Sequence, residues 1–168
     1  FATGGFQNTF GNLTDAYLVK FNASGTRQWG TYYGGTNFDE GAQCAVDKQG
    51  SIFLCGTTQS TTNISGSGFQ NTKNSGRDGF LAKFNPNGTR QWGTYYGGPS
   101  ADFGNSVCVD TLLNVYLSGF TYSTSSIASG GFQNSFGGAN DAYLVKFNTN
   151  GSRLWGTYYG GSNGDYGP

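Results

Sequence analysis

Short runs of alternating hydrophobic and polar residues dominate the chain and predict β-strands rather than helices. In Asp15–Asn22, the side chains of Tyr17, Val19 and Phe21 fall on one face of the expected strand. A short glycine-bearing turn separates this run from Arg27–Tyr33, where the alternation resumes. Two such runs joined by a tight turn predict a β-hairpin.

Two further strands are expected after this hairpin, at Ala42–Asp47 and Ile52–Thr57, with the turn Lys48–Ser51 between them. A long polar loop rich in Ser and Thr then leads to the next hairpin. The same order recurs, with strands expected at Asp78–Asn85, Gln91–Tyr96, Ser106–Asp110, Val115–Phe120, Asp141–Asn148 and Leu154–Tyr159. Four short antiparallel strands per cycle are typical of β-propeller blades, whereas the repeats of a parallel β-helix are far shorter and lack hairpins. The expected fold is therefore all-β, with tandem four-stranded antiparallel blades of a β-propeller or a propeller-like repeat array.

A fixed sequence period runs through these strands. The heptapeptide Trp-Gly-Thr-Tyr-Tyr-Gly-Gly begins at Trp29, Trp92 and Trp155, so consecutive copies start 63 residues apart. A long period of this kind is the signature of a repeat architecture.

The period divides the chain into residues 1–40, a half blade with two strands, and residues 41–103 and 104–168, one blade each. Two and a half blades are fewer than the roughly four to eight that close a propeller ring. We therefore expect this chain to be one fragment of a larger repeat domain, completed by further repeats or further copies. The half blade is also expected to leave a strand edge open to pairing with another chain.

The repeated pattern resembles the bacterial SBBP repeat, named for the seven-bladed β-propeller. The resemblance rests on Gly138–Gly161 with Asp165, and on the copies at Asp15–Asp47 and Asp78–Asp110. The second copy departs from the pattern with Gly79 and Phe80 in place of Ala and Tyr. The resemblance implies an extracellular or cell-surface protein with several blades, and it implies no defined chemistry.

The composition and the net charge argue against some classes of binding partner. Lys and Arg together number 9, as do Asp and Glu, so the net charge is zero. A balanced charge argues against nucleic acid and against anionic membrane surfaces, which both select basic patches. No apolar run approaches the roughly 20 residues needed to span a bilayer.

Candidate catalytic chemistry is sparse. The chain has no His, which removes Ser-His-Asp and Cys-His catalysis and His-based metal sites. If Gln49-Gly50 is a two-residue turn, Cys44 and Cys55 lie directly opposite each other and are close enough for a disulfide. The alternative is two small buried thiols. Cys108 aligns with Ala45 and has no partner in this register.

Aspartates also recur with the period. Asp39, Asp102 and Asp165 occupy the loop after each heptapeptide. One interpretation is calcium coordination or paired-carboxylate chemistry. The alternative is hydrogen bonding to backbone amides in turns, which a position repeated in every blade favours, because catalysis needs one site whereas folding needs all of them. No cofactor is expected, with calcium the one candidate ion.

The repeated Trp29, Trp92 and Trp155 allow two interpretations. Large rings at equivalent positions commonly form the core between blades, but they can also stack on sugars. Five Asn-x-Ser/Thr sequons are candidate glycosylation sites: Asn12, Asn22, Asn63, Asn87 and Asn150.

The sequence thus predicts a non-enzymatic extracellular structural repeat protein. It would belong to a surface, matrix or filament, with further copies or repeats of the same protein as partners. The alternative is a propeller lectin that binds carbohydrate weakly at each blade and gains avidity through multivalency. An enzyme is the third possibility, and no unique constellation of residues supports it.

Overall fold

The computed structural model describes residues 1–74 and 76–168. These residues form ten β-strands and no helix. The strands pair, always antiparallel, into a hairpin and two four-stranded sheets, ordered β3-β4-β5-β6 and β7-β8-β9-β10. Their bounds are β1 (Ala16–Phe21), β2 (Arg27–Tyr33), β3 (Asp39–Val46), β4 (Ile52–Thr58), β5 (Asp78–Phe84), β6 (Arg90–Tyr96), β7 (Asp102–Val109), β8 (Val115–Thr121), β9 (Asp141–Phe147) and β10 (Arg153–Tyr159).

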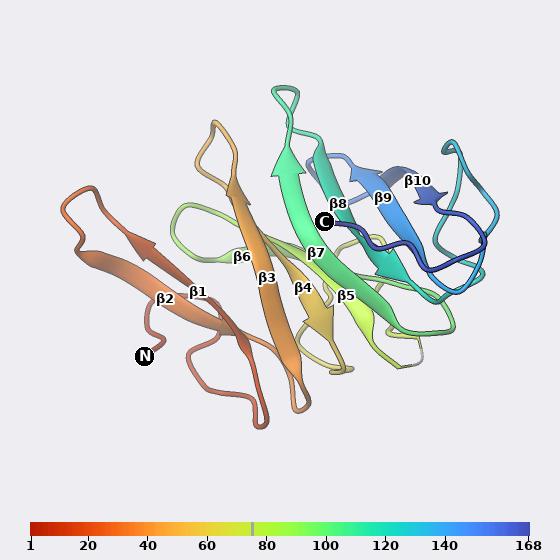
Figure 1. The fold of residues 1–168 in the computed structure, drawn as a ribbon. Coiled ribbons are helices and arrows are strands. Elements are labelled where there is room, and N and C mark those ends of the chain that lie inside the picture. The colour runs from red at the N-terminus through yellow and green to blue at the C-terminus, as the bar shows by residue number, and fades with distance from the viewer. Residues whose placement is uncertain (75) are drawn as a thin grey trace.

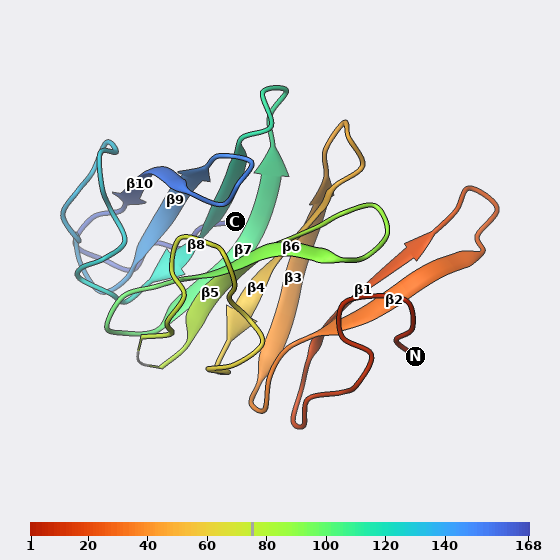
Figure 2. The same cartoon turned by 180° about the vertical axis from the view of Figure 1, so that it is seen from behind.

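The hairpin and the two sheets lie side by side as successive layers, in chain order (Figures 1 and 2). Each sheet is a simple meander, so each strand pairs with its neighbour in sequence. The expectation of an all-β fold with tandem four-stranded antiparallel blades is confirmed. The first strand of each blade is longer than expected, because β3 and β7 begin at Asp39 and Asp102 rather than several residues later.

The core lies between the layers. One cluster joins Leu18, Trp29 and Tyr33 of the hairpin to Phe80 and Phe84 of β5. A second cluster joins Trp92 and Tyr96 of β6 to Tyr143 and Phe147 of β9. It also includes buried residues of β4, β7 and β8. Burial of aromatic area therefore holds each blade against the next, and no blade has a core of its own.

The long loops before β5 and β9 are not free. The segment around Gly66 to Gln70 runs beside β6, where Gly66 and Gly93 exchange backbone hydrogen bonds and Tyr95 N donates to Gln70 O. The corresponding loop makes the same bonds to β10. The last strand of each sheet, β6 or β10, is thus covered by the long loop of the same blade. This removes a free strand edge that would otherwise favour aggregation.

The turn between β3 and β4 corrects the cysteine register expected from the sequence. Asp47 and Ser51 close a turn of three residues, with Gly50 at φ 80°, which is one residue longer than expected. Cys55 consequently pairs with Gln43, while Cys44 pairs with Leu54. Paired residues share a face and neighbours along a strand do not, so the two sulfurs lie on opposite faces of the sheet.

The predicted disulfide between Cys44 and Cys55 is therefore wrong, and all three cysteines are free thiols. Cys44 and Cys108 are exposed, whereas Cys55 is buried and burial raises the pKa of its thiol to about 12. We expect a thiol-specific reagent at pH 8 to label Cys44 and Cys108 in the native protein and Cys55 only after unfolding. Mass spectrometry of the labelled peptides reads this out, and rapid native labelling of Cys55 would contradict the burial.

None of the described residues belongs to a helix long and apolar enough to cross a membrane.

Candidate functional site

The most developed site in the molecule is the joint between one blade and the next, which occurs twice with the same residues. In the first joint, the ring of Tyr33 lies between Phe80 and Phe84, with centroids 5.2 and 5.6 Å away. In the second, Tyr96 lies between Tyr143 and Phe147 at 5.1 and 5.9 Å. Each Tyr is the last residue of the final strand of one blade, and its ring packs against the third strand of the next blade.

A tryptophan closes each joint against a glycine turn. Trp29 Nε1 donates to Pro86 O at 3.0 Å, and the indole covers Gly88, where an added Cβ would lie 2.9 Å from Trp29 Cδ2. Trp92 makes the same contact with Thr149 O and Gly151. Both tryptophans are buried. The glycines have positive φ and lack a Cβ, so the turn can adopt its shape and the indole can approach its backbone.

Substitution of Gly88 by alanine tests this closure, and Gly25 provides a matched control. Both glycines sit in the same kind of hairpin turn, at φ 82° and φ 78°, but no atom lies within 4 Å of a Cβ added to Gly25. The two variants share the backbone strain, while only Gly88→Ala crowds Trp29. We expect Gly88→Ala to cost about 1–3 kcal/mol more than Gly25→Ala in urea unfolding. Equal costs would mean that the indole contact contributes nothing.

Two further contacts complete each joint. The guanidinium of Arg90 stacks over the ring of Phe6 at 4.3 Å, and that of Arg153 over Phe69 at 4.4 Å. Cation–π pairs of this kind are worth about 0.5–2 kcal/mol. The Tyr96 hydroxyl donates to Ile127 O at 2.6 Å, as does the Tyr33 hydroxyl to Ile64 O.

Sequence reasoning missed these Arg–Phe and Tyr–carbonyl contacts. The signal was available, because Phe6, Phe69 and Phe132 recur with the same 63-residue period as Arg27, Arg90 and Arg153. Periodicity does not say which of the recurring residues meet across a joint.

The repeated aspartates of the loops hydrogen-bond the end of the last strand of one blade to the first two strands of the next blade. Asp102 accepts hydrogen bonds from Gly98 N at 2.8 Å, from Ser123 Oγ at 2.9 Å and from the Thr121 hydroxyl. Asp39 accepts the same set from Gly35, Ser60 and Thr58. Within residues 1–74 and 76–168, the Asp165 carboxylate accepts a hydrogen bond from Gly161 N alone, at 2.7 Å, and Asp165 is only half-buried.

A second aspartate set organises the preceding loop. Asp78 Oδ2 accepts from Gln70 Nε2 and from Asn74 N, both at 3.1 Å, while its buried Oδ1 has no hydrogen-bond partner among the described residues. Asp15 and Asp141 repeat this arrangement. Loss of hydration raises the pKa of Asp78 and of Asp102 to about 6. In the described part of the chain, no group of three or more Asp, Glu, Cys or His side chains could hold a metal ion.

The remaining predicted site residues lie at the surface or at the last blade. Trp155 lies on the last described sheet and is only half-buried. The five sequon asparagines, Asn12, Asn22, Asn63, Asn87 and Asn150, are all exposed. Glycan attachment at these positions stays a prediction.

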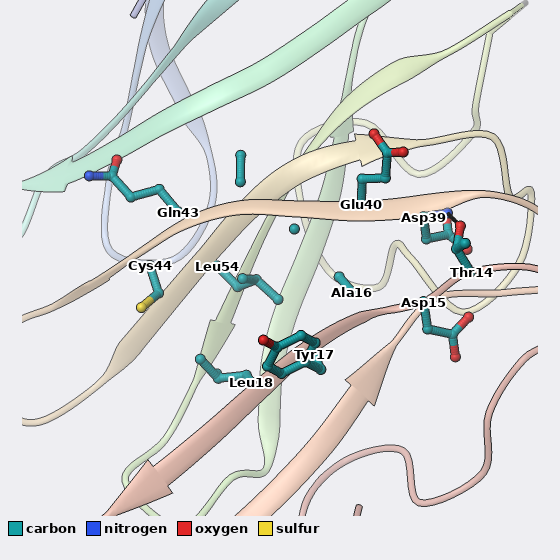
Figure 3. Close-up of a pocket in the computed structure, with 12 residues that line it drawn as sticks. Thr14, Asp15, Ala16, Tyr17, Leu18, Asp39, Glu40, Gln43, Cys44 and Leu54 are labelled. Atoms are coloured by element: carbon teal, nitrogen blue, oxygen red, sulfur yellow. Dashed lines mark hydrogen bonds between the residues drawn. The ribbon is translucent and has the colours of Figure 1, made fainter. Parts of the chain in front are cut away.

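Two open cavities lie along the array. One of about 410 Å³ lies between β1 and the strands β3 and β4. Figure 3 shows side chains of β1, among them Leu18, facing this space from one side, with Gln43 and Cys44 projecting from opposite sides of β3. The other cavity, of about 390 Å³, lies against Phe132, Leu144 and Trp155 on the last blade. The first cavity thus lies between the hairpin and the first four-stranded sheet, and the second lies on the last sheet.

Comparison with known families decides the identity of the repeat. A family model described as SBBP, a beta-propeller repeat, matches residues 91–125, and a model described as a beta-propeller domain of unknown function (DUF5122) matches residues 127–153. This chain is a β-propeller repeat protein. No curated protein matched the chain.

The matched segments run through the joint of the β-propeller repeat. The SBBP match covers most of β6 and all of β7 and β8, and it contains Trp92, Tyr96 and Asp102. The DUF5122 match covers β9 and ends at Arg153. The residues that link blades therefore lie within the segments by which the repeat is identified.

Proposed function

We propose that this β-propeller repeat protein is a non-enzymatic extracellular structural component of a cell surface, matrix or filament. The observation that carries the proposal is the burial of the recurring aromatic residues: Trp29, Trp92, Tyr33 and Tyr96 all lie in joints between blades. These recurring aromatic residues therefore hold neighbouring blades together. An extracellular setting is supported by the resemblance to bacterial SBBP repeats and by five exposed sequons.

The same observation weighs against one sugar-binding site per blade. Trp29 is 5% exposed and Trp92 is 4% exposed, so their faces are not available to a ligand. Recurring aspartates are occupied by amide and hydroxyl donors rather than arranged as a pair of catalytic acids. A structural role requires only the packed blades described above, whereas a lectin or an enzyme would need a further open site.

A glycan array tests the proposal against the lectin alternative. The chain is displayed at high valency on beads and probed against a broad panel of glycans, with Trp155→Ala as the control for the half-buried indole of the last blade. We expect no binding. Saturable binding to a defined sugar class would overturn the structural role in favour of a multivalent lectin.

Protease treatment of intact cells that express the native protein tests its location. We expect digestion without lysis. Protection until the cells are lysed would overturn the extracellular assignment.

A further inference from the structure

The two ends of this array carry the two halves of an inter-blade joint. Tyr159 is the period equivalent of Tyr33 and Tyr96, yet it is 70% exposed, whereas both of those are fully buried. At the other end, Tyr17 and Phe21 are equivalent to the residues that enclose Tyr33 and Tyr96. Tyr17 is 65% exposed and Phe21 is 58% exposed. Each end therefore presents aromatic surface that the other end is built to cover.

The C-terminal face is open only where a third and fourth strand would dock. Its inner part is already covered by residues 165–168, where Asn105 Nδ2 donates to Gly167 O at 3.1 Å and Tyr166 packs against Phe120. Its outer part holds the cavity of about 390 Å³ beside Trp155 and Phe132. Phe132 is 87% exposed, whereas its equivalents Phe6 and Phe69 stack on an arginine of the next blade.

The N-terminal face has matching vacancies. At Gly93 and Gly156, an added Cβ would lie 2.5 and 2.6 Å from the hydroxyl of the tyrosine from the preceding blade. At the equivalent Gly30, the nearest atom is Phe1 O at 3.4 Å. No tyrosine hydroxyl of the described residues lies near this position. The equivalent acceptor is Phe1 O, which lies farther from the added Cβ than Ile64 O and Ile127 O do, at 2.3 and 2.6 Å. Gly25, likewise, has no indole above it.

We propose that a second copy of this chain occupies the C-terminal face, docking through its β1–β2 hairpin. Tyr159 then lies between the partner's Tyr17 and the partner's Phe21, and donates to the partner's Phe1 carbonyl. Trp155 covers the partner's Gly25, and Phe132 stacks on the partner's Arg27. The contact joins different surfaces on the two copies, so it repeats head to tail and builds either a ring or a filament.

Internal joints supply the argument for this occupant. Both are made by a hairpin of the same sequence pattern as β1–β2, and each seats its Tyr, Trp and Phe on the same three features. The inference rests on the proposed structural function, because it names the partner through which that role would be carried out.

Two single variants and their mixture test the docking by sedimentation velocity over a concentration series. Tyr159→Asp blocks the C-terminal face and Tyr17→Asp blocks the N-terminal face; both positions are exposed, so the fold is expected to persist, as checked by circular dichroism. A carboxylate in an aromatic joint is costly to bury, so we expect each variant to self-associate at least about 100-fold more weakly than the wild type. Leu112→Asp adds the same charge on an exposed turn away from both faces and should assemble as the wild type does.

The mixture identifies the geometry. Each variant retains the one face that the other lacks, so an equimolar mixture should form a 1:1 dimer and stop there, while the wild type forms longer species. A wild type that stays monomeric at the highest concentration, or a mixture that stays monomeric, would overturn the proposal. Dimers of Tyr159→Asp alone would also overturn it, because they would mean that identical faces associate.

Failure here is distinguishable from failure of the proposed function. A monomeric chain that binds no glycan leaves the structural role intact and removes only the self-docking. A chain that assembles and also binds a sugar class keeps the docking and removes the purely structural role.

Discussion

Replacement of Asp102 by alanine is expected to lower the free energy of unfolding by roughly 3 kcal/mol. The carboxylate is fully buried and accepts from Gly98 N, Ser123 Oγ and the Thr121 hydroxyl. Alanine leaves these donors without an acceptor, and each unpaired buried donor costs about 1–3 kcal/mol. Part of the loss is offset, because burial raises the pKa of Asp102 to about 6 and the charged carboxylate is itself costly to bury at pH 7.

Asp165 provides the matched control within the same repeat. It occupies the equivalent position but accepts only the Gly161 N–H and is half-buried. Asp165→Ala should therefore change the free energy of unfolding by less than about 0.5–1 kcal/mol in the same urea titration. Similar losses for the two variants would show that the carboxylate supports its own turn in both and does not latch one strand to the next.

The repeat made much of this fold predictable. Alternating residues, glycine turns and the 63-residue spacing of the tryptophans predict four antiparallel strands per blade, and the structure has them. The prediction worked because each signal occurs more than once, so a local ambiguity in one copy is resolved by the next. Local propensity and global pattern agree throughout the strands.

The register of β3 against β4 was not predictable in the same way. The turn closed by Asp47 and Ser51 holds three residues rather than the expected two, and this shift of one residue moves Cys44 to the face opposite Cys55. A shift of one residue reverses the face of every side chain in a strand. Hydrophobic pattern alone does not fix the length of a turn, so it cannot predict a contact that depends on one position in a strand.

The sequence revealed which residues recur at the contacts between blades, but not which residues they contact. Recurrence singled out the tryptophans and aspartates, but it gave no partner for either. Trp29 meets a turn 57 residues further along the chain, and Asp102 binds a hydroxyl 19 residues away. Such pairings follow from the stacking of one blade on the next, which the spacing within a repeat does not specify.

Alkaline pH is expected to unfold the protein cooperatively between about pH 10 and pH 12. Burial raises the pKa of Tyr95 and Tyr158 to about 12 and holds that of Tyr33, Tyr96 and Tyr143 higher still. In the unfolded chain these hydroxyls ionise near pH 10. The stability they contribute is therefore complete below pH 10 and is lost as the pH rises toward their folded-state pKa values.

The expected size of the effect follows from the number of groups. Each tyrosine costs the folded state about 1.4 kcal/mol for every pH unit above 10. Five such groups lose on the order of 10 kcal/mol by pH 11.5, which is comparable to the whole stability of a typical domain. Circular dichroism and tyrosinate absorbance should change together at one midpoint, because the buried hydroxyls ionise only when the blades separate.

Tyr143→Phe separates this mechanism from general alkaline damage. The Tyr143 hydroxyl is buried and has no hydrogen-bond partner in the described part of the chain, and the equivalent position in the preceding blade is Phe80. Its removal should cost little at pH 7, or even stabilise the fold, since an unpaired buried hydroxyl is itself unfavourable. With one fewer ionising group, the alkaline midpoint should move to higher pH. An unchanged midpoint, or tyrosinate absorbance that rises well before the circular dichroism signal is lost, would show that the buried tyrosines do not govern the transition.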